Sequence, residues 1–138
     1  MSEVRLVITG AAGFIGGQLL ASNARSYPAA ELLAVDHPVT GAKRANLNAA
    51  PGVAFLDHTT FINALESGAL DPELILHMGA CSSTTEADWG YLADNNLRYS
   101  QRLWTWCAAH GRRLIYASSA ATYGDGARGF DDLSLIHI

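Results

Sequence analysis

A glycine-rich turn after the first apolar stretch is the feature that most constrains the fold. Residues 4–9 are typical of a buried strand, because apolar and β-branched side chains dominate them. Gly10, Gly13 and Gly16 follow at a spacing of three, and a helical pattern covers residues 14–25. Glycine permits a tight turn between two such elements. We therefore expect a strand–turn–helix unit that begins an α/β domain with parallel strands.

The same turn has the features of a phosphate-binding loop. Gly10 would permit the turn, Gly13 would let a pyrophosphate approach the backbone, and Gly16 would let helix and strand pack closely. The helix N-terminus adds free N–H groups and partial positive charge. A second apolar run ends in Asp36, twenty residues after Gly16, where a carboxylate would accept hydrogen bonds from an adenosine ribose. This order of elements predicts a dinucleotide site, whereas a glycine-rich turn alone would only join strand to helix.

Strand and helix patterns alternate along the rest of the chain. Further strands are expected at 32–36, 53–56, 73–78 and 113–118, and further helices at 59–68 and about 88–110. Thr59 or Thr60 would cap the first of these helices, and Gly111 would end the second. Right-handed crossovers then give a Rossmann-type α/β fold, a doubly wound parallel sheet in the order 3-2-1-4-5.

Composition excludes several classes of protein. The 138 residues make one domain of ordinary size, and 49% hydrophobic with 16% charged residues is typical of a globular chain. A net charge of −4 gives no reason to expect nucleic acid as a partner. No apolar run is long enough for a membrane span and no signal peptide is visible, so a cytoplasmic location is expected. Cys81 and Cys107 are interpreted as buried thiols, and no metal site is predicted.

Three later segments carry candidate chemistry. After the strand at 73–78, Gly79 and Ala80 would leave a thin wall beside a ribose and a nicotinamide. The hydroxyls of residues 82–85 would bind phosphate or sugar, although such a run also occurs in helix-capping loops. Asn95 would order backbone or water near a reacting centre, or cap its helix. Ser119, after the fifth strand, would hydrogen-bond a substrate hydroxyl or carbonyl, or belong only to a turn.

The long helix should present an apolar stripe to the core. Residues at helical spacing that form the stripe are Leu97, Ser100, Leu103, Trp104 and Cys107. We assign three of the side chains on this helix to the core rather than to a ligand site: Trp104, Trp106 and Cys107.

These segments resemble one family of enzymes. The glycine spacing is similar to that of the extended short-chain dehydrogenase/reductase superfamily. Residues 77–86, 94–100 and 116–124 resemble its ADP-glycero-manno-heptose 6-epimerase family, and the resemblance extends from residue 4 to about 132. It implies that NADP⁺, or NAD⁺, takes hydride from C6″ of a nucleotide-linked heptose and returns it to the opposite face. The full-length protein would bind this nucleotide sugar and would be able to form a homo-oligomer.

The resemblance also implies roles for single positions. Phe14 and Ile15 would lie under the pyrophosphate, Asp36 and His37 would flank the adenosine ribose, and Lys43 would meet the 2′-phosphate of NADP. The residues implied on the nicotinamide side are Met78, Gly79, Ala80, Cys81 and Ser82, with Asn95 nearby.

Two departures from the family pattern bear on activity. Ser119 matches the serine of the Ser–Tyr–Lys catalytic group, but the Tyr-x-x-x-Lys motif has no counterpart, since Lys43 is the single lysine. His58 stands where the family usually has a second basic residue, which weakens the case for tight NADP binding. We therefore expect residues 1–132 to be an incomplete NAD(P)-binding domain, inactive alone and truncated before the later strands and the substrate domain. Residues 133–138 would be a tail that does not match the family.

Two other interpretations stay open. One is a different nucleotide-sugar epimerase or dehydratase, such as a UDP-hexose 4-epimerase, against which the loop at 81–86 and residues 94–96 argue. The other is a catalytically silent NAD(P)-binding module, which the missing tyrosine and lysine favour.

Overall fold

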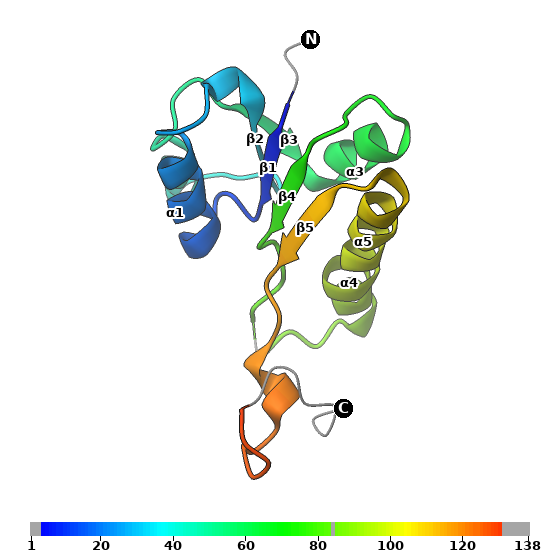
Figure 1. Cartoon of the computed structure of the whole chain (residues 1–138). Coiled ribbons are helices and arrows are strands. Elements are labelled where there is room, and N and C mark those ends of the chain that lie inside the picture. The colour runs from blue at the N-terminus through cyan, green and yellow to red at the C-terminus, as the bar shows by residue number, and fades with distance from the viewer. Residues whose placement is uncertain (1–3, 84, 131–138) are drawn as a thin grey trace.

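Five parallel strands form a single sheet in the computed structural model, which describes residues 4–83 and 85–130. The strands are β1 (Leu6–Thr9), β2 (Leu32–Asp36), β3 (Ala54–Asp57), β4 (Leu74–His77) and β5 (Arg113–Tyr116). Their order, β3-β2-β1-β4-β5, confirms the predicted Rossmann-type α/β fold (Figure 1). The tail expected at 133–138 lies outside the described residues.

The register brings the carboxyl ends of the central strands together. Thr9 pairs with Val35 of β2 on one side and with His77 of β4 on the other. The loops after β1, β2 and β4 therefore leave the sheet on the same side, at the carboxyl ends of the strands. Because the strand order reverses between β1 and β4, the carboxyl ends of these strands are where doubly wound folds place their ligand crevice.

Helices cover both faces of the sheet (Figure 1). The helices on one face are α1 (Phe14–Asn23) and α2 (Ala42–Leu47). Those on the other face are α3 (His58–Glu66), α4 (Trp89–Leu92), the π-helical turn η2 (Ala93–Arg98) and α5 (Tyr99–His110). Two short 3₁₀ turns, η1 (Ala29–Glu31) and η3 (Ala120–Tyr123), complete the order of elements.

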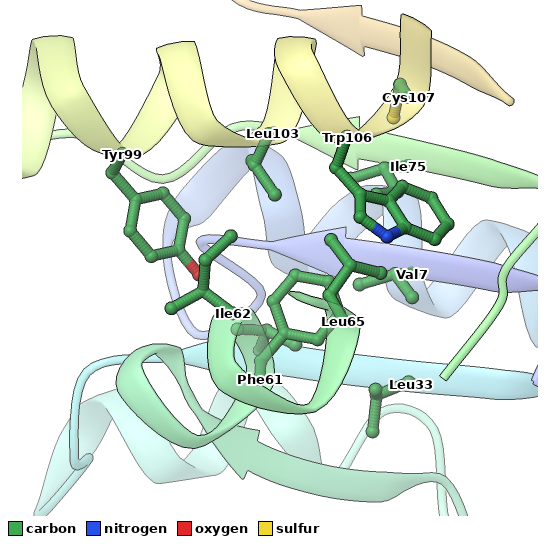
Figure 2. Close-up of a cluster of buried hydrophobic side chains, with 11 residues drawn as sticks. Val7, Leu33, Phe61, Ile62, Leu65, Ile75, Tyr99, Leu103, Trp106 and Cys107 are labelled. Carbon is green, nitrogen blue, oxygen red and sulfur yellow. The ribbon is translucent and has the colours of Figure 1, made fainter. Parts of the chain in front are cut away.

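Two apolar clusters fill the space between sheet and helices. Val7 points to the α3–α5 face, where it packs with Phe61, Leu65, Leu103 and other side chains (Figure 2). Its neighbours along β1, Leu6 and Ile8, belong to the cluster on the α1 face. Burial on both faces explains why the central strands are almost continuously apolar.

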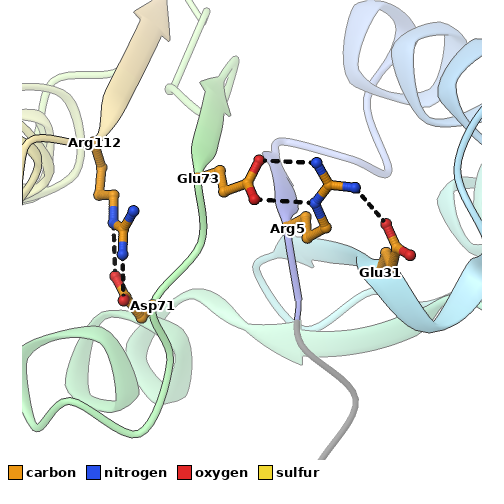
Figure 3. Close-up of polar contacts among 5 residues, drawn as sticks. All are labelled: Arg5, Glu31, Asp71, Glu73 and Arg112. Atoms are coloured by element: carbon orange, nitrogen blue, oxygen red, sulfur yellow. Dashed lines mark hydrogen bonds and ion pairs between the residues drawn. The ribbon is translucent and has the colours of Figure 1, made fainter.

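Ion pairs connect the residues that precede the strands, at the amino ends of the sheet. The Arg5 guanidinium pairs with Glu73 just before β4 and with Glu31 just before β2 (Figure 3). Arg112 pairs with Asp71 nearby. Hydrogen bonds from these guanidinium groups lower the pKa of Glu73 and of Asp71. Since these side chains are partly exposed to solvent, the pairs contribute little to stability.

The predicted strands and helices are all present, with ends within two residues of those expected, but several details differ. The helix α2 was not predicted. The cap of α3 is Asp57 rather than Thr59 or Thr60, because its carboxylate accepts the backbone N–H groups of both threonines at 3.1 and 3.0 Å. Hydrogen bonds to Thr60 lower the pKa of this carboxyl group. The predicted end of α5 at Gly111 is confirmed, with φ of +63°.

The long helix expected at about 88–110 is divided by the π-helical turn η2, and its buried stripe differs from the prediction. Trp104 is 60% exposed, whereas Trp106 is buried. Trp104 follows Leu103 directly and is rotated by about 100° from it, while Trp106 lies close to one turn further on. Leu97 is also exposed, so assigning Leu97 and Trp104 to the core was wrong.

The two cysteines differ in burial. Both are free thiols, and Cys107 is buried as predicted, which raises its pKa. Cys81 is only partly buried, because it lies in the loop after β4 rather than in a helix that faces the core.

Candidate nucleotide-binding site

The turn after β1 requires glycine at its first position. Gly10 has φ of +67°, a left-handed conformation that side chains rarely adopt. A Cβ there would also lie 2.8 Å from the backbone nitrogen of Gly79. The turn after β1 therefore packs directly on the loop after β4.

The other two glycines of the turn have different reasons to lack a side chain. A Cβ on Gly16 would lie 2.0 Å from the carbonyl oxygen of Gly10, so the fold itself excludes a side chain. Gly13 has φ of −78° and ψ of 176°, an extended conformation open to any residue. Its Cβ would meet only the Gly10 oxygen, at 3.2 Å. Gly13 is thus the position where a ligand, rather than the backbone conformation, would account for glycine.

The N-terminus of α1 is open to an anion. An α-helix leaves its first N–H groups without intrahelical acceptors. Within the described residues no side chain caps α1, and its first turn holds no acidic residue. Phe14 and Ile15, the first two residues of the helix, are 83% and 60% exposed. The unpaired N–H groups and the helix dipole together suit a phosphate group.

Asp36 fastens the glycine turn to the end of β2. One carboxylate oxygen accepts the N–H of Ala12 at 2.9 Å, and the other accepts the N–H of His37 at 2.7 Å. Each oxygen keeps further acceptor capacity for a hydroxyl. The predicted role towards a ribose therefore remains available, while the structural role of Asp36 was not foreseen.

The loop after β4 is held at two points. The Gly79 N–H donates to Thr9 Oγ1 at 3.1 Å. The Cys81 N–H donates to Asn96 Oδ1 at 2.7 Å, and Asn96 Nδ2 donates back to the Cys81 carbonyl at 3.0 Å. Met78 packs on the α1-side core, whereas Ala80 and Ser82 are exposed. The predicted nicotinamide-side residues thus form a fixed rim beside the glycine turn.

A small cavity of about 20 Å³ lies beside Gly10 and Gly79. The side chains that line it include His37, His58, His77, Asn95 and Tyr99. His37 Nε2 and Asn95 Oδ1 are 2.8 Å apart, so the structure brings together two of the predicted cofactor residues. The cavity is large enough for a single water molecule and far too small for adenosine. A nucleotide would have to lie outside it.

His58 does not supply the positive charge that a second basic residue would bring. Its ring centroid is 3.8 Å from that of His37. Burial and the neighbouring His37 lower the pKa of His58, which keeps the ring neutral near pH 7. Its Nδ1 atom is buried without a hydrogen-bond partner among the described residues.

His77, at the end of β4, is only 4% exposed and is hydrogen-bonded through both ring nitrogens. Nδ1 lies 2.6 Å from Thr9 Oγ1, and Nε2 lies 2.8 Å from Ser100 Oγ. Burial lowers the pKa of His77 from 6.5 to about 4. The imidazole is therefore neutral across the physiological range.

The pKa of His77 predicts an acid-sensitive fold. The unfolded chain takes up this proton near pH 6.5 and the folded chain only near pH 4, so acidification favours unfolding between these values. At about 1.4 kcal/mol per pH unit, we expect the free energy of unfolding to fall by about 2 kcal/mol from pH 7 to pH 5. Urea titrations at both pH values measure it, and His77→Gln should flatten the dependence. If the free energy of unfolding of this variant depends on pH as steeply as that of wild type, His77 is not the group responsible.

Two predicted site residues lie apart from this rim. Lys43 is exposed on α2 and lines neither described cavity. Ser119 is exposed after β5, where its Oγ accepts the Ala121 N–H at 3.2 Å and caps η3. The chain after β5 runs away from the sheet (Figure 1). Their predicted roles therefore remain predictions.

A hollow of greater volume lies elsewhere among the described residues. It has a volume of about 420 Å³ and lies between α2 and the edge strand β3, lined by Arg44, Asn48, Phe55 and neighbours. It does not touch the glycine turn or the carboxyl ends of β1 and β4. We therefore place the candidate site at the glycine turn, where backbone N–H groups, Asp36 and the loop after β4 converge.

The strand order and the glycine turn define a Rossmann-type α/β domain, and comparison with known proteins gives its family. Residues 6–136 match the model of the NAD dependent epimerase/dehydratase family. The chain belongs to this family. Within the described residues no helix is long and apolar enough to cross a membrane.

One curated relative is the ADP-L-glycero-D-manno-heptose-6-epimerase of Nitratidesulfovibrio vulgaris. It is 42% identical over 128 residues, which are 91% of this chain and 39% of the relative. The chain therefore spans about two fifths of that relative's length.

Two solved structures share the fold. A UDP-N-acetylglucosamine 4-epimerase from Methanobrevibacter ruminantium, in complex with UDP-N-acetylmuramic acid, has a TM-score of 0.77 at 23% identity, covering 97% of this chain and 44% of its own. The Bordetella bronchiseptica enzyme WbmG, in complex with NAD and UDP, has a TM-score of 0.69 at 27% identity, covering 89% and 40%.

Proposed function

We propose that this chain is the NAD(P)-binding part of an ADP-glycero-manno-heptose 6-epimerase. The observation that carries the cofactor assignment is the uncapped N-terminus of α1 beside Gly13, a glycine that its own backbone conformation does not require. The 42% identity to a heptose epimerase supports the sugar. A cytoplasmic location and a homo-oligomeric full-length protein are part of the same proposal.

The bound dinucleotide would supply the hydride acceptor and donor. The chain's residues would bind and orient it. The N–H groups of the first turn of α1 would donate hydrogen bonds to the phosphates, and the Asp36 carboxylate would accept hydrogen bonds from hydroxyls of the adenosine ribose. The rim at 78–82 limits the space on the nicotinamide side. Ser119 would hold the hydroxyl or carbonyl of the sugar by a hydrogen bond.

The test is to incubate the full-length gene product with the ADP-linked heptose and follow C6″ by NMR. We expect interconversion of the two epimers without net consumption of cofactor, and a large loss of rate in Ser119→Ala. Residues 1–138 alone should show no turnover, because they contain no Tyr-x-x-x-Lys motif to move the hydroxyl proton. Turnover of UDP-hexose instead would favour the second epimerase interpretation. Cofactor binding without turnover of any nucleotide sugar would favour the silent module.

Cofactor choice depends on Lys43 in this proposal. Asp36 alone would favour NAD⁺, since a carboxylate repels a 2′-phosphate, whereas the cationic Lys43 lies seven residues further on. A charged hydrogen bond contributes about 1.5–3 kcal/mol, so Lys43→Ala should weaken NADP⁺ binding by roughly tenfold or more and leave NAD⁺ nearly unchanged. Calorimetric titration with both cofactors measures this. Arg44→Ala is the matched control, because Arg44 lines the separate α2–β3 hollow. Equal weakening of NAD⁺ and NADP⁺ by Lys43→Ala would exclude the contact.

A further inference from the structure

We infer that Thr9, His77, Ser100 and Asn96 form a hydrogen-bonded relay, buried at Thr9 and His77 and exposed at Asn96, that positions residues 79–81 against the nicotinamide half of the cofactor. The inference rests on the proposed function, because it assumes that this loop faces a nicotinamide dinucleotide. It assigns His77 and its two hydroxyl partners as positioning residues, which act on the cofactor only through the loop.

The hydrogen bonds of the relay have one consistent direction. Thr9 Oγ1 accepts the Gly79 N–H at 3.1 Å, so its own hydrogen is available to His77 Nδ1, 2.6 Å away. The neutral imidazole then carries its hydrogen on Nε2 and donates it to Ser100 Oγ at 2.8 Å. The Ser100 hydroxyl donates in turn to the Asn96 carbonyl at 3.2 Å. Thr9, His77 and Ser100 each therefore donate once and accept once, and the chain of bonds ends at the backbone carbonyl of Asn96, whose side chain bonds separately to Cys81.

The two ends of the relay are the two points that hold the loop. Thr9 holds Gly79 at the start of the loop, and Asn96 holds the N–H and the carbonyl of Cys81 two residues later. Thr9 belongs to β1, whereas Ser100 and Asn96 belong to α5 and η2 on one face of the sheet. His77 joins β1 to α5 by hydrogen bonds to Thr9 and to Ser100. Loss of one link should therefore loosen the loop at a distance.

The relay meets the adenosine half of the site through one side-chain path: Asn95 Nδ2 donates to Asn96 Oδ1 at 2.9 Å, and Asn95 Oδ1 lies 2.8 Å from His37 Nε2. Asp36 and the N–H groups of Ala12 and His37 form their own hydrogen bonds, none of which includes a relay member. A general loss of folding would weaken every ligand, whereas a displaced nicotinamide-side loop should weaken only ligands that reach it. ADP, which ends at the second phosphate, serves as the ligand that does not reach the loop.

The experiment is calorimetric titration of the full-length gene product with NAD⁺ and with ADP. Thr9→Val and Ser100→Ala remove one hydroxyl each, and Thr9→Ser and Ser100→Thr keep it. The expected result is a roughly tenfold weaker Kd for NAD⁺ in the first pair, the loss of about one net hydrogen bond, with the Kd for ADP within twofold of wild type. The hydroxyl-retaining variants should restore NAD⁺ binding. The double variant should lose less than the product of the single losses, because both act through His77.

A spectroscopic readout accompanies the titration. The ¹⁵N shift of His77 Nδ1 should move in Thr9→Val and return in Thr9→Ser. If wild type binds both ligands, the relay would be overturned by either of two results. One is that the hydroxyl-removing variants lose affinity for NAD⁺ and ADP equally, and the other is that they lose affinity for neither. Failure of wild type to bind both ligands would instead refute the proposed function.

Discussion

Replacing Gly16 with alanine is expected to destabilise the chain by about 3 kcal/mol, the upper end of the usual range for overpacked positions where backbone must move. The new Cβ would lie 2.0 Å from the Gly10 oxygen, 2.6 Å from the Gly10 carbonyl carbon and 3.0 Å from the Ala11 Cα. All three atoms are backbone. Relief therefore requires that α1 move away from β1, which opens the α1-side core around Leu20.

The matched control is the same substitution one residue later. A Cβ on Gly17 would lie 3.3 Å from the Asn46 Cβ and 3.4 Å from the Ala11 carbonyl oxygen, so a shift of a few tenths of an ångström would relieve it. Alanine is also favoured over glycine inside a helix by about 1 kcal/mol. We expect Gly17→Ala to stay within about 1 kcal/mol of wild type in urea unfolding. Similar stabilities for the two variants would show that Gly16 does not set the approach of α1 to the turn.

Replacing Gly13 with valine should abolish cofactor binding while preserving the fold. Gly13 has an extended conformation with negative φ, so the substitution introduces no left-handed strain, and its Cβ would contact only the Gly10 oxygen at 3.2 Å. The branched side chain would stand at the uncapped N-terminus of α1, where a pyrophosphate must approach. We expect at least a hundredfold weaker binding of NAD⁺ and NADP⁺, roughly 3 kcal/mol.

Titration calorimetry with circular dichroism separates the two roles of the turn. The helical content of Gly13→Val should remain near that of wild type. The cofactor affinity of Gly13→Ala should lie between that of wild type and that of the valine variant. Unchanged binding in the valine variant would rule out this turn as the phosphate site.

The fold could be predicted because its determinants are local in the sequence. The central strands are buried on both faces, so they read as short apolar runs, and Gly111 ends α5 through its left-handed conformation. The helix α2 was missed because its six residues carry no apolar period and none is fully buried, although Leu47 packs against the α1-side core. The π-helical turn was missed because such turns are rare and have no composition of their own.

The site was predictable where it is contiguous and not where it depends on packing. The spacing of Gly10, Gly13 and Gly16 is a local signal. The contact of His37 with Asn95 joins residues 58 positions apart, and the contact of Asn96 with Cys81 spans 15 positions. These depend on how α5 and η2 lie on the sheet. A histidine at the end of an apolar strand was the one available signal of the relay, since a buried imidazole needs partners.

The central claim is that a nicotinamide dinucleotide binds at the glycine turn and the carboxyl ends of β1, β2 and β4. The most direct measurement is chemical-shift mapping of the ¹⁵N-labelled protein during titration with NAD⁺. We expect saturable shifts at residues 10–16, at Asp36 and His37 and at 79–82, with the signals of Asn48 and Gly52 in the α2–β3 hollow unmoved. Shifts confined to that hollow, or no saturable shift in protein shown to be folded, would contradict it.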